Sequence, residues 1–307
     1  MATVIAVDTG NVCIKTVKDQ FVSGLKEYKT RPSNGESLCF EGRFYSLVNE
    51  RRSYEEDKTK SIDTFILTLF GVCKYLSRYR DYEEGMDIVL SVGLPPEHML
   101  NAAKRDAWAA YFVSYGRKIE CEYNGKKYSF YIKKVDICPQ GYALVFSNPE
   151  YSKLNKLYVC DIGGYTVDVI KVCKGILDNS LIRSLSLGII TYYNMAQNQV
   201  KTDTGINIDE DTINEFLETG TTNRKDVTEA LQTSFTEYAK KVINKISELD
   251  GIDLRLHNVV FIGGGAKYLE SEIKKVSEGV KSVTFIKDPR INAIGYQKMT
   301  ERKLSRK

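Results

Sequence analysis

This chain has very few histidines and no closely spaced pair of cysteines. Its 307 residues include only two histidines, and its seven cysteines are widely spaced without a C-x-x-C motif. This pattern argues against a zinc site and against a disulfide framework. Cys13, Cys138 and Cys160 lie in apolar, strand-like stretches, and we expect them to be small core residues.

Long hydrophobic runs are also lacking. The longest, residues 65–73, includes Thr68 and Gly71 and is much shorter than the about 20 residues that span a bilayer. A strand-like stretch begins at Val4, so we expect no signal peptide. The sequence therefore predicts a cytoplasmic protein that does not enter the membrane.

The chain has no large excess of charge of either sign. Its 44 basic and 40 acidic residues give a net charge of +4, which is too small to predict a nucleic-acid surface. We expect the basic residues near the C-terminus to lie in the last turn of a helix, where cations are favourable. Hydrophobic residues make up 42% of the chain, as in globular proteins. The length allows two domains of about 150 residues.

The same short motif, an aspartate followed two residues later by glycine, ends an apolar run at two places. Residues 4–7 lead into Asp8 and Gly10, and residues 157–160 lead into Asp161 and Gly163. Each pattern predicts a strand, a tight turn and a returning strand. Glycine lets N–H groups approach an anion, and a carboxylate at a strand end can hold a hydrated magnesium ion. Two such hairpins facing each other would bind the phosphates of a nucleotide from both sides.

The order of the other predicted elements repeats between the two halves of the chain. In the first half, residues 40–48 are the only strand-like stretch between about 26 and 60. After it we expect a helix from Ser61, a strand at 86–92 and a helix over 95–113. We also expect two hairpin strands, at 119–123 and 128–137, around Asn124-Gly125. In the second half, strands are expected at 157–162, 165–173, 176–186, 257–262 and 283–286, and helices from 189, over 209–217, over 225–249 up to Asp250-Gly251, and from Asp288-Pro289. We interpret this repetition as a duplicated α/β unit with a ligand cleft between the copies.

Four residues of the first half are candidates for nucleotide chemistry besides Asp8. Gly10 and Asn11 offer turn amides, and Lys15 on the returning strand can reach a β-phosphate while Asp8 handles the metal. The alternative is an ordinary turn followed by an exposed lysine. Gln140, in Pro139-Gln140-Gly141, can orient an attacking water at the start of a helix, or this tripeptide can simply cap that helix.

In the second half, candidates lie in residues 161–168 and 263–265. Gly163 and Gly164 suit a turn whose amides point at phosphate oxygens, and Thr166 can donate a further hydrogen bond. Asp168 lies among valines and isoleucines, so its carboxylate needs a partner, either near metal-bound water or in a salt bridge. Gly263, Gly264 and Gly265 end a buried strand, where the backbone can approach a ribose, although they also suit a flexible loop.

In this order, the motifs resemble those of the actin-like ATPase superfamily. They correspond to its first phosphate loop, first connecting helix, second phosphate loop, adenosine loop and second connecting helix, the last at residues 291–296. Within the superfamily, the short first domain and residues 161–168 are most similar to the ParM-like plasmid-segregation actins. Gln140 departs from the ParM pattern, which often has an acid there, and is similar to actin.

The resemblance implies an α/β fold of two duplicated ribonuclease-H-like domains around a nucleotide cleft. The first domain would be residues 1–150, with a small subdomain at about 26–60 and the C-terminal helix 289–307 packing back on it. The second would be residues 151–288, with a helical subdomain at about 203–250.

The resemblance also implies a role for each candidate residue. Asp8 and Asp161 would hold Mg²⁺ through water, and Gln140 and Asp168 would position and activate the hydrolytic water. The β- and γ-phosphates would be bound by Gly10, Asn11, Lys15, Gly163, Gly164, Tyr165 and Thr166. Gly263, Gly264 and Gly265 would border the adenosine.

The implied activity is hydrolysis of ATP, or also GTP, coupled to assembly of the chain into dynamic filaments. These filaments would segregate plasmid DNA through a DNA-bound adaptor of the ParR type, with no direct contact to DNA. Two alternatives share the fold. One is an actin-fold ATPase of the cell-division adaptor type, and the other is a small-molecule kinase, for whose acceptor pocket 307 residues leave little room.

Overall fold

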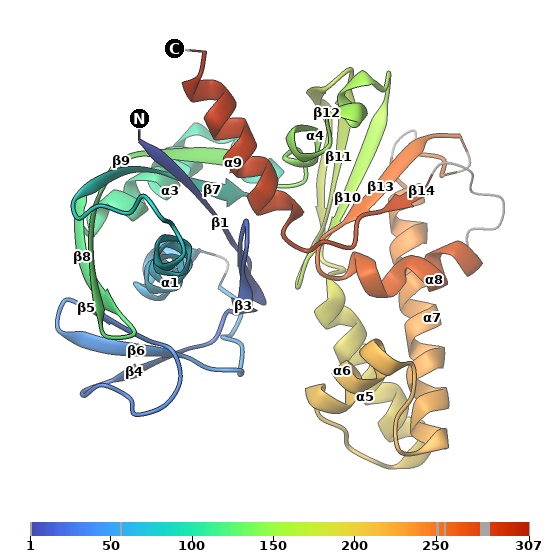
Figure 1. The fold of residues 1–307 in the computed structure, drawn as a ribbon. Coiled ribbons are helices and arrows are strands. Elements are labelled where there is room, and N and C mark those ends of the chain that lie inside the picture. The colour runs from blue at the N-terminus through green and yellow to red at the C-terminus, as the bar shows by residue number, and fades with distance from the viewer. Residues whose placement is uncertain (1, 56, 250–251, 255, 277–282, 307) are drawn as a thin grey trace. The chain divides into compact units, whose positions relative to one another are not determined.

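The computed structural model describes residues 2–55, 57–249, 252–254, 256–276 and 283–306 (Figure 1). The chain divides into two compact units. Unit 1 comprises residues 1–150 and 289–307, and unit 2 comprises residues 151–288.

Unit 1 is built on a mixed sheet of strands in the order β3-β2-β1-β7-β9-β8-β5-β6-β4. The strands are β1 (Thr3–Thr9), β2 (Cys13–Thr16), β3 (Gln20–Val22), β4 (Leu25–Tyr28), β5 (Ser37–Phe40), β6 (Arg43–Leu47), β7 (Met86–Leu94), β8 (Lys118–Tyr123) and β9 (Lys126–Pro139). Its helices are the 3₁₀ turn η1 (Lys58–Lys60), α1 (Asp63–Ser77), α2 (Pro96–Met99), α3 (Ala102–Ser114), α4 (Leu144–Ser147) and α9 (Ile291–Leu304).

Helix α1 lies inside the curve of this sheet, with β9, β8 and β5 bending around it (Figure 1). Residues on every side of α1 are buried, because strands surround it rather than covering one face. Burial of its apolar side chains from water is the main force that holds the curved sheet around it.

Unit 2 has a sheet in the order β12-β11-β10-β13-β14. Its strands are β10 (Leu157–Ile162), β11 (Val167–Cys173), β12 (Ile176–Leu185), β13 (Asn258–Ile262) and β14 (Val283–Phe285), and its helices are α5 (Ile189–Thr204), α6 (Glu210–Thr219), α7 (Lys225–Ser247) and α8 (Ala266–Val276). A short 3₁₀ turn, η2 (Pro149–Lys153), runs across the boundary of the two units in sequence. Helices α5, α6, α7 and α8 share one apolar core with this sheet.

The two sheets repeat one plan. In each, three antiparallel strands are followed by two parallel ones, giving β3-β2-β1-β7-β9 in unit 1 and β12-β11-β10-β13-β14 in unit 2. The predicted duplication of an α/β unit is therefore confirmed. Strands β8, β5, β6 and β4 extend the first sheet beyond the shared plan.

Several predicted boundaries in unit 1 were wrong. The stretch 40–48 is a hairpin turn and strand β6 rather than one strand, because Glu41 and Gly42 adopt positive φ values of 50° and 76°. Strand β4 was not predicted at all. The helix expected over 95–113 is two helices, and Asn101 breaks it by accepting a hydrogen bond from the Lys104 N–H at 3.2 Å, as the cap of α3.

Other expected helix starts and ends also differ. No helix begins at Gln140, since α4 starts at Leu144. The last helix begins at Ile291 and not at Asp288-Pro289, with Arg290 as its N-cap. Asp250-Gly251, expected to end α7, lies outside the described residues. The Asn124-Gly125 hairpin is confirmed, with φ values of 49° and 83°.

Of the three cysteines expected in the core, Cys138 and Cys160 are buried, whereas Cys13 is half-buried. Cys13 lies on the short strand β2, which pairs with β3 at the edge of the sheet.

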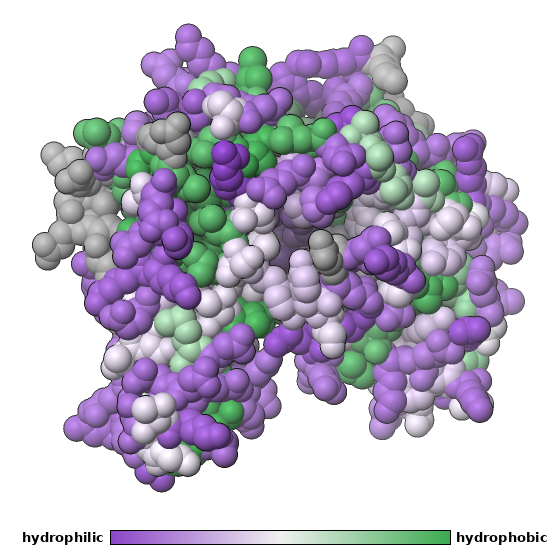
Figure 2. Space-filling model, turned by 180° about the vertical axis from the view of Figure 1, so that it is seen from behind, coloured by the Kyte–Doolittle hydropathy of each residue, from purple (hydrophilic) through white to green (hydrophobic). Residues whose placement is uncertain are grey.

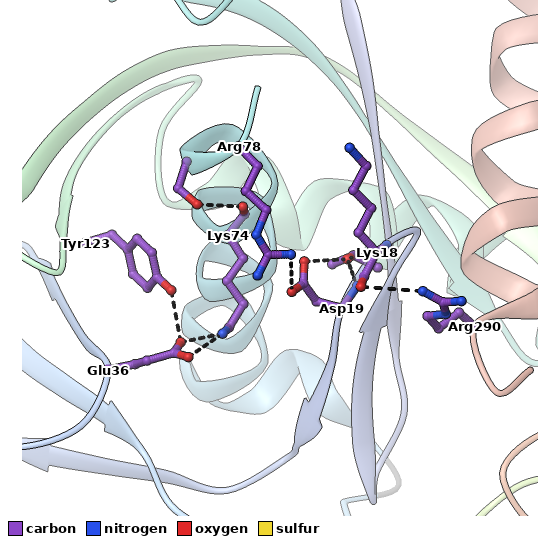
Figure 3. Close-up of polar contacts among 9 residues, drawn as sticks. Lys18, Asp19, Glu36, Lys74, Arg78, Tyr123 and Arg290 are labelled. Carbon is purple, nitrogen blue, oxygen red and sulfur yellow. Dashed lines mark hydrogen bonds and ion pairs between the residues drawn. The ribbon is translucent and has the colours of Figure 1, made fainter. Parts of the chain in front are cut away.

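Polar contacts tie the elements of unit 1 together (Figure 3). Glu36, which precedes β5, accepts hydrogen bonds from Lys74 of α1 at 2.5 Å and from Tyr123 of β8 at 3.0 Å. Asp19 accepts one from Arg78 at 2.7 Å. Arg290 donates to the Lys18 carbonyl at 3.5 Å and so connects the start of α9 to the β2–β3 turn.

The face shown in Figure 2 is mostly hydrophilic, with patches of hydrophobic residues between polar ones, the most extensive in the upper part of the view. Among the helices that the structure describes, none combines the length and apolar character needed to cross a membrane.

Candidate functional site

The first hairpin brings Asp8 and Lys15 together. They occupy directly opposite positions of the antiparallel pair β1–β2, so their side chains lie on one face of the sheet. The Lys15 ammonium lies 3.4 Å from the Asp8 carboxylate, and the Asp8 side chain is only 4% exposed. A buried carboxylate beside a lysine at a strand end is suited to a phosphate–magnesium group.

The turn of this hairpin requires glycine at position 10. A Cβ atom there would overlap the Cys13 carbonyl oxygen, so any other residue would force the turn apart. Within the described part of the chain, the N–H groups of Gly10 and Asn11 make no backbone hydrogen bond. They are therefore available to an anion.

Gln140 reaches the same carboxylate from the end of β9. Its side-chain N–H donates to Asp8 Oδ1 at 3.3 Å. The sheet order explains this contact between Gln140 and Asp8, because β9 is separated from β1 only by β7. Gln140 is further fixed by its backbone N–H, which donates to the Leu94 carbonyl at 3.1 Å, and by the next N–H, of Gly141, which donates to Asn292 of α9 at 3.0 Å.

Lys58 of η1 also lies at the first hairpin, although sequence reasoning did not select it. Its ammonium group donates a hydrogen bond to the Thr9 carbonyl. The lining of a pocket within unit 1 includes Thr9, Gly10, Asn11, Arg52, Glu55 and Lys58. Burial is the main cause that lowers the pKa of Lys58 to about 8; Lys15 and Arg52 contribute to this shift, and Asp8 and Glu55 partly oppose it.

In unit 2, Asp161 and Asp168 occupy the positions that Asp8 and Lys15 occupy in unit 1. They are directly opposite across the antiparallel pair β10–β11, and both are 7% exposed. Asp168 accepts hydrogen bonds from Ser184 at 2.5 Å and from Thr166 at 3.4 Å. Two neighbouring carboxylates on one face repel each other, and a cation near them would relieve that repulsion.

The turn after Asp161 is packed against the start of α5. The Gly163 N–H donates to the Thr166 carbonyl at 2.9 Å, which closes the turn and engages one of the amides expected to face phosphate. The carbonyls of Gly163 and Gly164 accept from Ile189 and Ile190 in the first turn of α5. A Cβ atom at Gly188 would overlap Gly164, so this glycine permits the close approach.

The glycines after β13 lie beside the same turn. Gly263 has a φ of 91°, and a Cβ atom there would overlap the Asp161 carboxylate. The Gly265 N–H donates to the Ile162 carbonyl at 3.1 Å. Gly264 has open space around its Cα, and α8 begins directly after Gly265 at Ala266.

The donor set fits magnesium held mainly by water and phosphate. In the described ranges, no group of three or more His, Cys, Asp or Glu side chains could hold a metal ion. Magnesium usually binds through one or two carboxylates and keeps several waters and substrate phosphates as its other ligands. Asp8 and Asp161 fit such a role, and the glycine turns and Lys15 fit the phosphates.

Sequence reasoning missed Lys58, Ser184 and Gly188, and it placed Asn292 in the motif at 291–296 without predicting its contact with Gly141. Gly188 had a local signal, since a glycine directly before a helical pattern can admit a neighbouring loop. The contacts of Ser184, Lys58 and Asn292 join residues 16, 49 and 151 positions apart along the chain, so no local pattern predicts these contacts.

The two α/β units share one strand order. In each unit an aspartate, Asp8 or Asp161, lies near the end of the first strand of a hairpin. This arrangement is that of the actin fold. Two family models match the chain, one in each half. Residues 6–142 match "Actin like proteins N terminal domain", and residues 159–275 match "Archaeal actin homologue MreB-like, C-terminal". Together these two actin-like models cover most of the chain, which therefore belongs to the actin-like proteins.

Solved structures of the same fold cover nearly the whole chain. A ParM from a 15-stranded filament of Clostridium botulinum has a TM-score of 0.77 and 20% identity, over 98% of this chain and 100% of that one. An archaeal actin homologue in complex with ADP has a TM-score of 0.74 and 17% identity, over 98% and 99%. The apo ParM protein of psk41 has a TM-score of 0.73 and 14% identity, over 99% and 98%. A comparison with curated protein sequences gave no match.

Proposed function

We propose that this protein binds and hydrolyses ATP, or also GTP, and that hydrolysis controls its assembly into filaments that segregate plasmid DNA. One observation carries the proposal. Both units place an aspartate at the same position of the same hairpin, next to a glycine turn. A Cβ atom would overlap the Cys13 carbonyl at Gly10 and would press against the Thr166 carbonyl, at 3.3 Å, at Gly163. Such paired loops are suited to a triphosphate and its magnesium ion.

In this proposal, residues of both units act on one nucleotide. Asp8 and Asp161 hold Mg²⁺ through water, and Gly263, Gly264 and Gly265 border the adenosine. The β- and γ-phosphates are bound by Gly10, Asn11, Lys15, Gly163, Gly164, Tyr165 and Thr166. When bound, the magnesium ion neutralises phosphate charge during hydrolysis.

Gln140 and Asp168 prepare the hydrolytic water. An amide side chain can donate to and accept from a water but cannot take its proton, so Gln140 orients and Asp168 accepts the proton. Ser184 and Thr166 donate to the two Asp168 oxygens and fix the direction of this carboxylate. The hydrogen bond from Gln140 to Asp8 holds the amide at the phosphate loop before nucleotide arrives.

The proposal also includes assembly into filaments and a DNA-binding adaptor. Filament structures among the similar proteins support self-assembly, including that of the C. botulinum ParM and of AlfA bound to AMPPNP. A net charge of +4 supports indirect contact with DNA through an adaptor of the ParR type.

Light scattering and negative-stain electron microscopy test this function. Mg²⁺ and ATP should raise the light scattering of the purified protein and produce filaments. Phosphate release should precede disassembly of these filaments. Added sugars or acetate should leave phosphate release unchanged, which separates an ATPase from a kinase of this fold. Steady ATP hydrolysis without any polymer would contradict the assembly role.

A further inference from the structure

Lys58 is a half-buried cation at the first phosphate loop to which no nucleotide role has been assigned above. It reaches the loop from η1, 49 positions away in sequence, and donates to the Thr9 carbonyl between Asp8 and Gly10. Of the described residues, none forms an ion pair with its ammonium group. Lys15, by contrast, has Asp8 within 3.4 Å.

The surroundings of Lys58 favour an anion. A buried ammonium group is stable only when an opposite charge or several acceptors compensate for its lost hydration. Here the compensation is incomplete, since burial and the nearby Lys15 and Arg52 lower the Lys58 pKa to about 8. A phosphate group would supply the missing negative charge.

The pocket next to Lys58 has the chemistry of a phosphate site. Thr9, Asn11 and Thr64 offer hydroxyl or amide groups, and Gly10 offers a backbone N–H. Lys58 and Arg52 also line the pocket, and so does the Glu55 carboxylate. Glu55 at 2.7 Å and Asp63 at 3.1 Å form ion pairs with Arg52. Arg52 is therefore engaged, and Lys58 is the better placed cation for a ligand.

We propose that Lys58 is a second phosphate-binding lysine of the first loop, which exchanges its hydrogen bond to Thr9 for one to the terminal phosphates of a bound nucleotide. This inference rests on the proposed nucleotide binding. It connects the segment between β6 and α1 directly to the nucleotide. Because a triphosphate carries more negative charge than a diphosphate, Lys58 should favour the triphosphate form.

Calorimetric titration of the full chain with AMPPNP or ADP, each with Mg²⁺, tests the proposal. Lys58→Met should weaken AMPPNP binding about ten- to hundredfold, the effect of one charge-assisted hydrogen bond, and ADP binding less. Lys58→Arg keeps the charge and should lose less affinity than Lys58→Met. The matched control is Lys60→Met in the same turn, where the side chain is 80% exposed and affinity should not change.

Thermal unfolding without nucleotide separates a ligand from a structural tie. If Lys58 serves to bind phosphate, Lys58→Met should not lower the unfolding temperature. If Lys58 instead holds the loop in place, the substitution should lower it. Unchanged AMPPNP affinity in Lys58→Met overturns the proposal, and so does an equal loss for both nucleotides together with a lower unfolding temperature. If the unaltered protein binds neither nucleotide, the proposed function itself fails.

Discussion

At the residue scale, the sequence selected the carboxylates of the proposed site but only some of the residues that contact them. Asp8, Asp161 and Asp168 were predictable because an acid at the end of, or inside, an apolar strand needs a partner. Asp8 lies opposite Lys15 and Asp161 lies opposite Asp168, in each case seven places later, as the tight hairpins require. Ser184 was not predictable, because its place opposite Asp168 depends on a β11–β12 register that shifts between Ile170 and Lys171.

The stability of the nucleotide-free protein should depend on Lys58 and pH. The Lys58 pKa is about 8 in the folded chain and 10.5 in the reference state, so the unfolded chain binds more protons between these values. The free-energy cost of keeping a charged Lys58 in the folded chain is complete below pH 8 and disappears as the pH rises toward 10.5. Lys58→Met should therefore be more stable than the unaltered protein at pH 7, and this advantage should shrink by up to about 1.4 kcal/mol per pH unit above pH 8.

Chemical denaturation at pH 7, 8, 9 and 10 measures this difference. Comparing two variants at each pH cancels the titration of the tyrosines, whose pKa values are also shifted. A difference that stays constant from pH 7 to 10 would show that the Lys58 pKa is not lowered.

Asp168→Ala should retain nucleotide and lose hydrolysis. Without the carboxylate, the hydrolytic water has no proton acceptor, and phosphate release should fall about 100-fold or more. Asp178→Ala is the control, since Asp178 lies on β12 of the same unit and pairs with Lys171 at 2.7 Å. Phosphate release assays and nucleotide titration of both variants check this, and unchanged turnover of Asp168→Ala would refute the assignment.

At the element scale, the sequence predicted buried elements well and edge elements poorly. Strands β1, β7, β10 and β13 have continuous apolar runs, and each was found close to its predicted bounds. Strand β4 was missed because it lies at the sheet edge and carries the exposed charges of Lys26 and Glu27. Its pairing with β6 is a tertiary contact that local sequence does not encode.

Gly295 should be essential for the contact between α9 and α4. A Cβ atom there would overlap the Ala143 backbone carbonyl. A glycine-to-alanine change inside a helix normally stabilises it by about 0.5–1 kcal/mol. Gly295→Ala should instead destabilise unit 1 by about 1–3 kcal/mol, as overpacking does.

Urea denaturation of Gly295→Ala measures the sign of this effect. Arg302→Ala, at an exposed position of the same helix, should change the free energy of unfolding by less than about 0.5 kcal/mol. A stabilised Gly295→Ala would mean that α9 does not approach α4 closely.

Glu36 should stabilise the attachment of β5 to α1. Lys74 is 8% exposed, so Glu36→Ala leaves a buried ammonium group with one acceptor fewer and also removes the partner of Tyr123 (Figure 3). Because Glu36 itself is 39% exposed, we expect a moderate loss of about 1–3 kcal/mol.

The exposed pair of Glu27 and Arg43 provides the comparison for this variant. Their side chains are 50% and 64% exposed, and Glu27→Ala should change stability by less than about 1 kcal/mol. Equal effects of Glu36→Ala and Glu27→Ala would show that burial of Lys74 adds nothing to its ion pair.

At the scale of the whole molecule, the order of the motifs along the chain was more informative than any single motif. Aspartate-glycine turns are common, but their repetition half a chain apart, followed by residues 263–265 and 291–296, matched one fold. The duplicated strand order confirms that fold. Filament contacts were not predictable, because exposed side chains determine them and no periodic pattern marks such residues.

Calorimetric titration of Mg²⁺–AMPPNP into three forms of the full chain tests the central claim, that both aspartate hairpins serve one nucleotide. The forms are the unaltered protein, Asp8→Ala in unit 1 and Asp161→Ala in unit 2. We predict one nucleotide per chain, and weaker binding in each variant. Two independent binding events, or a variant of either hairpin that binds as tightly as the unaltered protein, would contradict the account.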